Sequence, residues 1–169
     1  MTRPKNTEAA DYYFKYIDLV TSDDVVPAFK DQMVETVRFL EGISEEQSLK
    51  AYAPGKWTIR QVLNHVNDGE RLFVSRAFWF ARGFTDAMPS FEQDVAVEHA
   101  HANDTSWAKL VDEFKTVRAA TISFFDTLPA EAWSRSGVAS DNPVTVRALA
   151  YIIAGHLEHH VNVLREKYL

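Results

Sequence analysis

The C-terminal stretch TVRALAYIIAGHLEHHVNVLREKYL, residues 145–169, decides the fold because it combines a clear helical period with unexpected side chains. At 3.6 residues per turn, its apolar side chains share one face with two histidines. That face consists of Val146, Leu149, Ile153, His156, His160, Val163 and Leu164. Two imidazoles therefore occupy positions at which a core helix normally carries apolar side chains.

His156 and His160 are four residues apart, so one imidazole lies a single turn above the other. This spacing allows two histidines of one helix to bind the same metal ion. The alternative is a pair of hydrogen-bonded core histidines, which is the commoner role of a histidine on an apolar face. Zinc-protease motifs would require glutamate where Leu157 or His159 stands, so the pair belongs to neither of these motifs.

Composition limits the possible functions. The chain has 169 residues, of which 46% are hydrophobic, so we expect one globular domain over residues 1–169. A formal net charge of -6 argues against nucleic acid as a partner. The absence of cysteine leaves histidine and carboxylate as the strong metal ligands. No apolar leader or membrane-length segment is apparent, so we expect a cytoplasmic protein without a membrane partner.

Four stretches have the apolar period of long amphipathic helices, and no strand pattern is convincing. The expected helices cover about residues 24–42, 58–83, 105–128 and 145–169, and a short helix or packing arm lies within residues 1–20. Thr58 and Gln61 form a T-x-x-Q capping box at the head of the second long helix. Thr105 is the expected cap of the third.

Residues 84–103 have no convincing helical period and contain Pro89, so we expect a long crossover loop. A connection of that length allows the second and third helices to run parallel, as in bundles with one long crossover. The sequence therefore predicts an all-α four-helix bundle with a long crossover between helices two and three.

His65 lies near the middle of the second expected helix. If that helix neighbours the fourth, His65, His156 and His160 form a site of three nitrogens, as bundle metal sites do. Three neutral imidazoles leave a coordination position open, which is typical of a catalytic rather than a structural divalent metal. The roles of His99 and His101, near the end of the crossover, and of His159, on the flank of the last helix, stay open.

Three segments together resemble the DinB-like (DinB/YfiT-like) family of metalloenzymes. They are PGKWTIRQVLNH at 54–65, PSFEQD at 89–94, and VTVRAL with AGHLEHH between 144 and 160, and the resemblance covers about residues 24–169. It implies an up-down-down-up bundle, usually a homodimer, with a metal held by His65, His156 and His160. His159 matches a position that is not a ligand. Ligand softness then favours zinc, with nickel as the alternative.

The resemblance also implies a small-molecule substrate, and three functions are compatible with it. The first is thiol S-transferase or isomerase chemistry, in which the metal deprotonates a low-molecular-weight thiol that a cysteine-free chain must take as cosubstrate. The second is hydrolysis by a metal-bound hydroxide, with Glu70 as the candidate base one turn beyond His65. The third is a non-catalytic metal-bearing module for dimerisation or ligand binding. Its apolar pocket would be lined by Trp57, Phe73, Trp79, Phe80 and Phe91.

Overall fold

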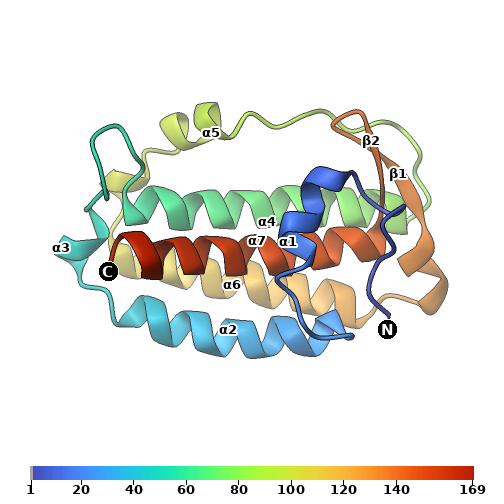
Figure 1. The fold of residues 1–169 in the computed structure, drawn as a ribbon, viewed down its shortest axis with the longest axis horizontal. Coiled ribbons are helices and arrows are strands. Elements are labelled where there is room, and N and C mark those ends of the chain that lie inside the picture. The colour runs from blue at the N-terminus through green and yellow to red at the C-terminus, as the bar shows by residue number, and fades with distance from the viewer. Residues whose placement is uncertain (1) are drawn as a thin grey trace.

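Four long helices form a bundle in the computed structural model, which describes residues 2–169. They are α2 (Val25–Glu41), α4 (Ile59–Ala81), α6 (Trp107–Asp126) and α7 (Val146–Lys167). Helices α4 and α2 each pack against both α6 and α7, which makes α4 and α2 diagonal partners in the bundle (Figure 1). The predicted four-helix bundle is confirmed.

Shorter elements surround the bundle. They are η1 (Asp11–Tyr13), α1 (Phe14–Ile17), α3 (Glu45–Ser48), α5 (Gln93–Ala100), η2 (Ala102–Asp104), η3 (Ala130–Ser134), β1 (Ser136–Ala139) and β2 (Asn142–Thr145). The N-terminal arm that contains η1 and α1 crosses α7 (Figure 1). The expected short N-terminal helix is therefore present.

The predicted helix starts are observed for α4 and α7. The Thr58 hydroxyl accepts a hydrogen bond from the Gln61 N–H at 3.2 Å, and the Gln61 side-chain oxygen accepts one from the Thr58 N–H at 2.9 Å. Thr145 caps α7 through its hydroxyl, which accepts from a backbone N–H three residues later. The reciprocal bonds at the start of α4 and the single capping bond at the start of α7 satisfy N–H groups that a helix start otherwise leaves without partners.

Helix α6 begins one residue later than predicted. Its N-cap is Ser106 rather than Thr105, and the Ser106 side chain makes no capping bond. The Trp107 N–H is instead bound by the Glu45 carboxylate of α3 at 2.9 Å. A cap supplied from another element leaves no local pattern in the sequence.

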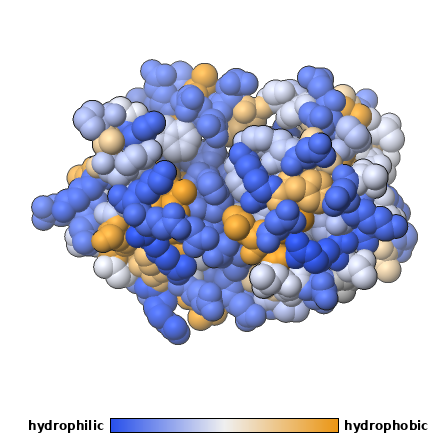
Figure 2. Space-filling view, in the orientation of Figure 1, coloured by the Kyte–Doolittle hydropathy of each residue, from blue (hydrophilic) through white to orange (hydrophobic). Residues whose placement is uncertain are grey.

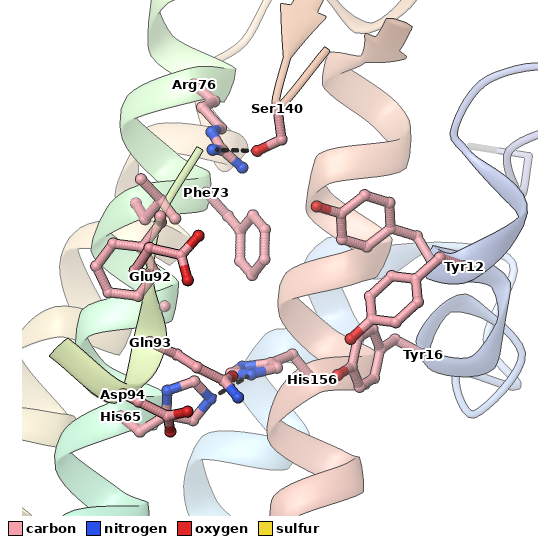
Figure 3. A pocket seen from close by; sticks show the side chains of 14 residues that line it. Tyr12, Tyr16, His65, Phe73, Arg76, Glu92, Gln93, Asp94, Ser140 and His156 are labelled. Atoms are coloured by element: carbon pink, nitrogen blue, oxygen red, sulfur yellow. Dashed lines mark hydrogen bonds between the residues drawn. The ribbon is translucent and has the colours of Figure 1, made fainter. Parts of the chain in front are cut away.

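The expectation of a structureless crossover at residues 84–103 is wrong in its second half, where α5 forms. Val97 is the one buried residue of this helix, and α5 packs on α4 through a narrow contact. A helix that buries so little has no apolar stripe, so periodicity could not reveal it. Its first turn places Glu92, Gln93 and Asp94 above α4 (Figure 3).

The expectation of an all-α chain is also wrong, because β1 and β2 form an antiparallel hairpin. Ser140 and Asp141 at its turn have φ values of 51° and 61°, and two consecutive positive φ angles are typical of a tight type I′ hairpin turn. Strands of four residues are too short to show a reliable alternation. Met88 pairs with Val138 and Ser140 through backbone bonds of 2.9 and 3.1 Å, which ties the crossover to the hairpin tip.

The face of the molecule in Figure 2 is largely hydrophilic, with hydrophobic residues in small separate patches. The exposed large hydrophobic residues belong to several different elements and include Tyr12, Val34, Phe78 and Val95. Among the helices of residues 2–169, none is long and apolar enough to cross a membrane.

A buried ion pair joins α4 to α6 inside the bundle. Arg118 Nη2 lies 2.8 Å from Glu70 Oε2, and the side chains are 0% and 3% exposed. The guanidinium also stacks over Phe29, with 5.0 Å between its central carbon and the ring centroid. Burial lowers the pKa of Arg118, while Glu70 opposes that shift. In residues 2–169, Glu70 Oε1 and Arg118 Nε have no hydrogen-bond partner. Each buried charge is therefore compensated mainly by the opposite charge of its partner.

Replacing Glu70 by Met is expected to lower the free energy of unfolding by roughly 3–5 kcal/mol, because Arg118 is left as an uncompensated buried cation. The double variant Glu70→Met with Arg118→Leu is expected to recover most of that loss. Chemical denaturation of the metal-free protein measures both. Glu113→Gln, which removes the exposed partner of Arg71, serves as the control and should cost at most about 1 kcal/mol. A single Glu70→Met variant as stable as the control would contradict this account.

Candidate metal centre

Three imidazoles from two helices meet at one point. His65 comes from α4, and His156 and His160 come from successive turns of α7. His65 Nε2 lies 3.1 Å from His156 Nε2, and His160 Nε2 lies 3.2 Å from the same atom. One nitrogen from each ring falls within 4.8 Å of the others. The three histidines singled out in the sequence are therefore brought together.

All three imidazoles are held in the neutral form that binds metals. Burial, opposed by the charge of Asp94, lowers the pKa of His65 to about 4. Burial and the neighbouring histidines lower the pKa of His160 to about 3 and that of His156 well below its usual value. A neutral imidazole nitrogen offers either one N–H or one lone pair, so His156 Nε2 cannot form good hydrogen bonds to both neighbours. A cation bound by three lone pairs would satisfy all three nitrogens, so the residues fit a divalent metal.

The close approach of α4 to α7 depends on Gly69. A Cβ atom at position 69 would lie 2.9 Å from His156 Cε1, nearer than ordinary van der Waals contact. Gly69 lies one turn after His65 on α4, so the absence of its side chain makes room for the His156 ring. The glycine thus permits the two helices to contribute to one site.

Aromatic side chains fix the orientation of the imidazoles. The ring centroid of Trp57 is 5.0 Å from that of His65, and Tyr16 and Phe73 approach the His156 ring edge-on at 5.4 and 5.8 Å. Burial raises the pKa of Tyr16, so its phenol stays protonated and can donate a hydrogen bond. His65 Nδ1 has no hydrogen-bond partner in residues 2–169, so packing against Trp57 orients the His65 ring on that side.

The N-terminal arm reaches this site because of a second glycine. A Cβ atom at Gly155 would lie 1.9 Å from the Tyr16 carbonyl oxygen, so only glycine allows the α1 backbone to rest directly on α7. Tyr16 then lies beside His156, and the arm forms one wall of the site (Figure 3). The N-terminal arm therefore shapes the pocket.

A pocket of about 350 Å³ opens onto His65 and His156. This volume is at the lower end of the range for small-molecule sites. Tyrosines of the arm face Phe73 and Arg76 of α4 across it, while Gln93 and Asp94 cover the histidine end and Glu92 lies beside Phe73 (Figure 3). The lining residues are Tyr12, Tyr13, Tyr16, His65, Gly69, Leu72, Phe73, Arg76, Phe91, Glu92, Gln93, Asp94, Ser140 and His156.

Sequence reasoning missed most of these residues. The segment 89–94 contributed to the family resemblance, but no role was assigned to Glu92 or Asp94. Arg76 and the arm tyrosines gave no signal, because their proximity to the histidines arises from tertiary packing. Of the aromatic residues expected in a pocket, Phe73 and Phe91 line it. Trp57 packs on His65 instead, Trp79 stacks on Phe84, and Phe80 is buried in the core.

The remaining candidates lie away from the pocket or beside the three histidines. Glu70 is outside the pocket lining and is bound to Arg118, so its role as a base stays a prediction that competes with this ion pair. His99 is exposed and its Nδ1 lies 2.9 Å from the Val95 carbonyl, and His101 is exposed at the end of α5. His159 packs edge-on against Tyr16 and His160, with centroids 5.4 and 5.0 Å apart.

Comparisons with known proteins agree with this architecture. The structure of YfiT from Bacillus subtilis, described as a probable metal-dependent hydrolase with an unusual four-helix bundle topology, has a TM-score of 0.70 and 15% identity over 96% of this chain and 89% of that one. A mycothiol-dependent maleylpyruvate isomerase has a TM-score of 0.69 and 14% identity over 86% of this chain and 61% of that one. At such identities the likeness concerns the fold. Among curated proteins, no significant sequence match is found.

The family is decided by sequence rather than by shape. The model of the DinB superfamily matches residues 28–164, which include the four bundle helices almost completely and all three histidines of the cluster. The resemblance found in the sequence motifs is confirmed, and the chain belongs to the DinB superfamily.

Proposed function

We propose that the chain is a divalent-metal-dependent enzyme that acts on a small-molecule substrate with a low-molecular-weight thiol, either transferring the thiol to the substrate as an S-transferase or adding and releasing it as a thiol-dependent isomerase. His65, His156 and His160 are the proposed metal ligands, with zinc as the first choice and nickel as the second. The single observation that supports this is the convergence of three neutral imidazoles, two buried and one half-buried, beside an open pocket. A cytoplasmic location, a single domain, the up-down-down-up helix order and a homodimer are further proposals.

Two features are compatible with a thiol. The chain has no cysteine, so a sulfur nucleophile must come from outside. The pocket is lined at the histidine end by His65 and His156, whereas His160 lies outside its lining, so a ligand reaches the centre from one side. A divalent ion held by three neutral histidines supplies a thiolate or a hydroxide at neutral pH.

Asp94 is the proposed acceptor of the proton that the nucleophile loses. It lines the pocket at the histidine end, and its charge acts on His65 (Figure 3). Asp94 is exposed and makes no ion pair in residues 2–169, unlike Glu70, so its carboxylate is free to accept a proton. The protonated phenol of Tyr16, on the opposite wall, is hydrogen-bonded to the Tyr12 side chain.

Hydrolysis is the second candidate, and the same carboxylate favours it. Asp94 could accept a proton from water as well as from a thiol, and the geometry of the pocket does not require sulfur. A non-catalytic metal-bearing module is the third candidate. The three functions differ in whether turnover occurs and whether it needs a thiol.

The zinc-loaded protein is expected to conjugate glutathione, mycothiol or bacillithiol to chlorodinitrobenzene and to leave p-nitrophenyl acetate intact without a thiol. Asp94→Asn should lower kcat by about 100-fold, because a positioned base is lost. Glu98→Gln, which changes an exposed carboxylate on the same helix, is the matched control and should not alter kcat. Thiol-independent ester cleavage would instead support hydrolysis, and tight zinc binding without turnover of either compound would support the non-catalytic module.

Gly69→Ala is expected to weaken zinc binding at least tenfold while the metal-free protein stays folded. The new methyl group would displace the His156 ring, and the gain of about 0.5–1 kcal/mol from alanine in place of glycine within a helix offsets part of the packing cost. Competition with a chromophoric chelator measures the zinc affinity, and thermal denaturation of the metal-free protein measures stability. Ser75→Ala, an exposed position on the same helix, provides the comparison. Unchanged zinc affinity in Gly69→Ala would show that His156 is not held in its binding position by this contact.

A further inference from the structure

Arg76 lies at the end of the pocket opposite the three histidines (Figure 3). It follows His65 by eleven residues on α4, about three helical turns, and its side chain points to the same cavity. The residue is only 2% exposed. The pocket therefore has a metal-binding end and a cationic end, separated by Phe73.

The partners of Arg76 are neutral. Its Nη2 donates to the Pro89 carbonyl at 2.7 Å and to the Ser140 hydroxyl at 3.0 Å. The Tyr13 side chain also interacts with the guanidinium. Within residues 2–169, no carboxylate forms an ion pair with Arg76, and its Nε has no hydrogen-bond partner. A buried guanidinium without a counter-ion is costly, and an incoming anion would offset that cost.

The guanidinium is held in place by elements outside the bundle. Pro89 belongs to the crossover and Ser140 to the hairpin turn, and Met88 links these two segments by backbone bonds. Both contacts use Nη2, so they leave the other N–H groups of the guanidinium unused. Arg76 is therefore fixed before a ligand arrives, and it retains N–H donors for that ligand.

We propose that Arg76 binds a carboxylate group of the substrate, so that the reacting atoms of the same molecule lie at the histidine end. This inference rests on the proposed function and specifies its substrate class: a small organic acid whose carboxylate and reactive group are separated by a short apolar spacer. Phe73 and Leu72, between the two ends, provide the apolar surface for that spacer.

The pocket favours a carboxylate over a phosphate ester. One guanidinium carries one positive charge, which matches the single charge of a carboxylate. Glu92 and Asp94 line the same cavity and would repel a second negative charge.

A series of ω-mercaptoalkanoates tests the proposal on the cobalt-loaded protein, with the matching ω-mercaptoalkanols as neutral probes. The thiolate-to-cobalt absorption band reports binding at the metal, and its titration gives the affinity. At the best chain length the acid is expected to bind about tenfold or more tightly than the alcohol, which corresponds to one charge-assisted hydrogen bond. Arg76→Met should abolish this preference and leave the affinity for the alcohol unchanged, and Arg76→Lys should retain part of it.

The control is Arg82→Gln, which removes an exposed arginine at the end of the same helix, and it should keep the full preference. Equal affinities for acid and alcohol in the wild type, or an undiminished preference in Arg76→Met, would overturn the proposal. Tighter binding of an alkyl phosphate than of the alkanoate of the same length would overturn the choice of carboxylate.

A second measurement separates this proposal from the proposed function. If no thiol gives the absorption band, the thiol chemistry fails, and thermal denaturation of the metal-free protein then decides the role of Arg76. Stabilisation by an alkanoate, but not by its alcohol, that is lost in Arg76→Met would support the carboxylate site without the metal. The same small shift of the melting temperature with the alkanoate and the alcohol, or with the wild type and Arg76→Met, would overturn the carboxylate site. Melting of Arg76→Met without ligand confirms that the variant folds.

Discussion

The close contact of α4 with α7 is the constraint on which the site depends. His65 is on one helix and His156 and His160 are on the other, so three nitrogens converge only if the helices approach without an intervening side chain. Gly69 provides that approach, and Trp57, Tyr16 and Phe73 then fix the ring orientations. The bundle is the scaffold, and the lack of a side chain at Gly69 determines where its histidines meet.

The pocket beside the histidines is built from elements that do not belong to the bundle. The arm supplies the tyrosine wall, α5 supplies Glu92 and Asp94, and the hairpin turn supplies Ser140 beside Arg76. These three additions lie on one side of the α4–α7 contact (Figures 1 and 3). Members of a superfamily can keep the same bundle and ligands while such additions change the substrate. Functional differences within this fold are therefore expected in the segments around the bundle.

Periodicity and capping predicted the parts of the fold that depend on local physics. The long helices follow from apolar stripes, and the starts of α4 and α7 follow from Thr58 and Thr145, whose hydroxyls bond within their own helices. Two histidines at helical spacing, together with a third on a helix expected to be their neighbour, predicted the cluster. The start of α6 was missed because Glu45 caps it from another element, and α5 was missed because it buries little more than Val97.

Tertiary contacts could not be predicted in the same way. Arg118 stands at a core position of α6 because its partner Glu70 comes from α4. Arg76 and Asp94 are likewise placed by packing, and neither shows a local motif. The sequence thus predicted the helices and the three histidines that converge, whereas the pocket and its charges required the structure.

The central claim is that His65, His156 and His160 hold one divalent ion. Elemental mass spectrometry of protein purified without a metal-affinity column tests it directly, on the wild type and on His156→Ala. The account predicts about one zinc or nickel ion per chain in the wild type and little or none in the variant. A wild type that contains no metal and takes up none after zinc or nickel is added, or a variant that retains its full metal content, would contradict it.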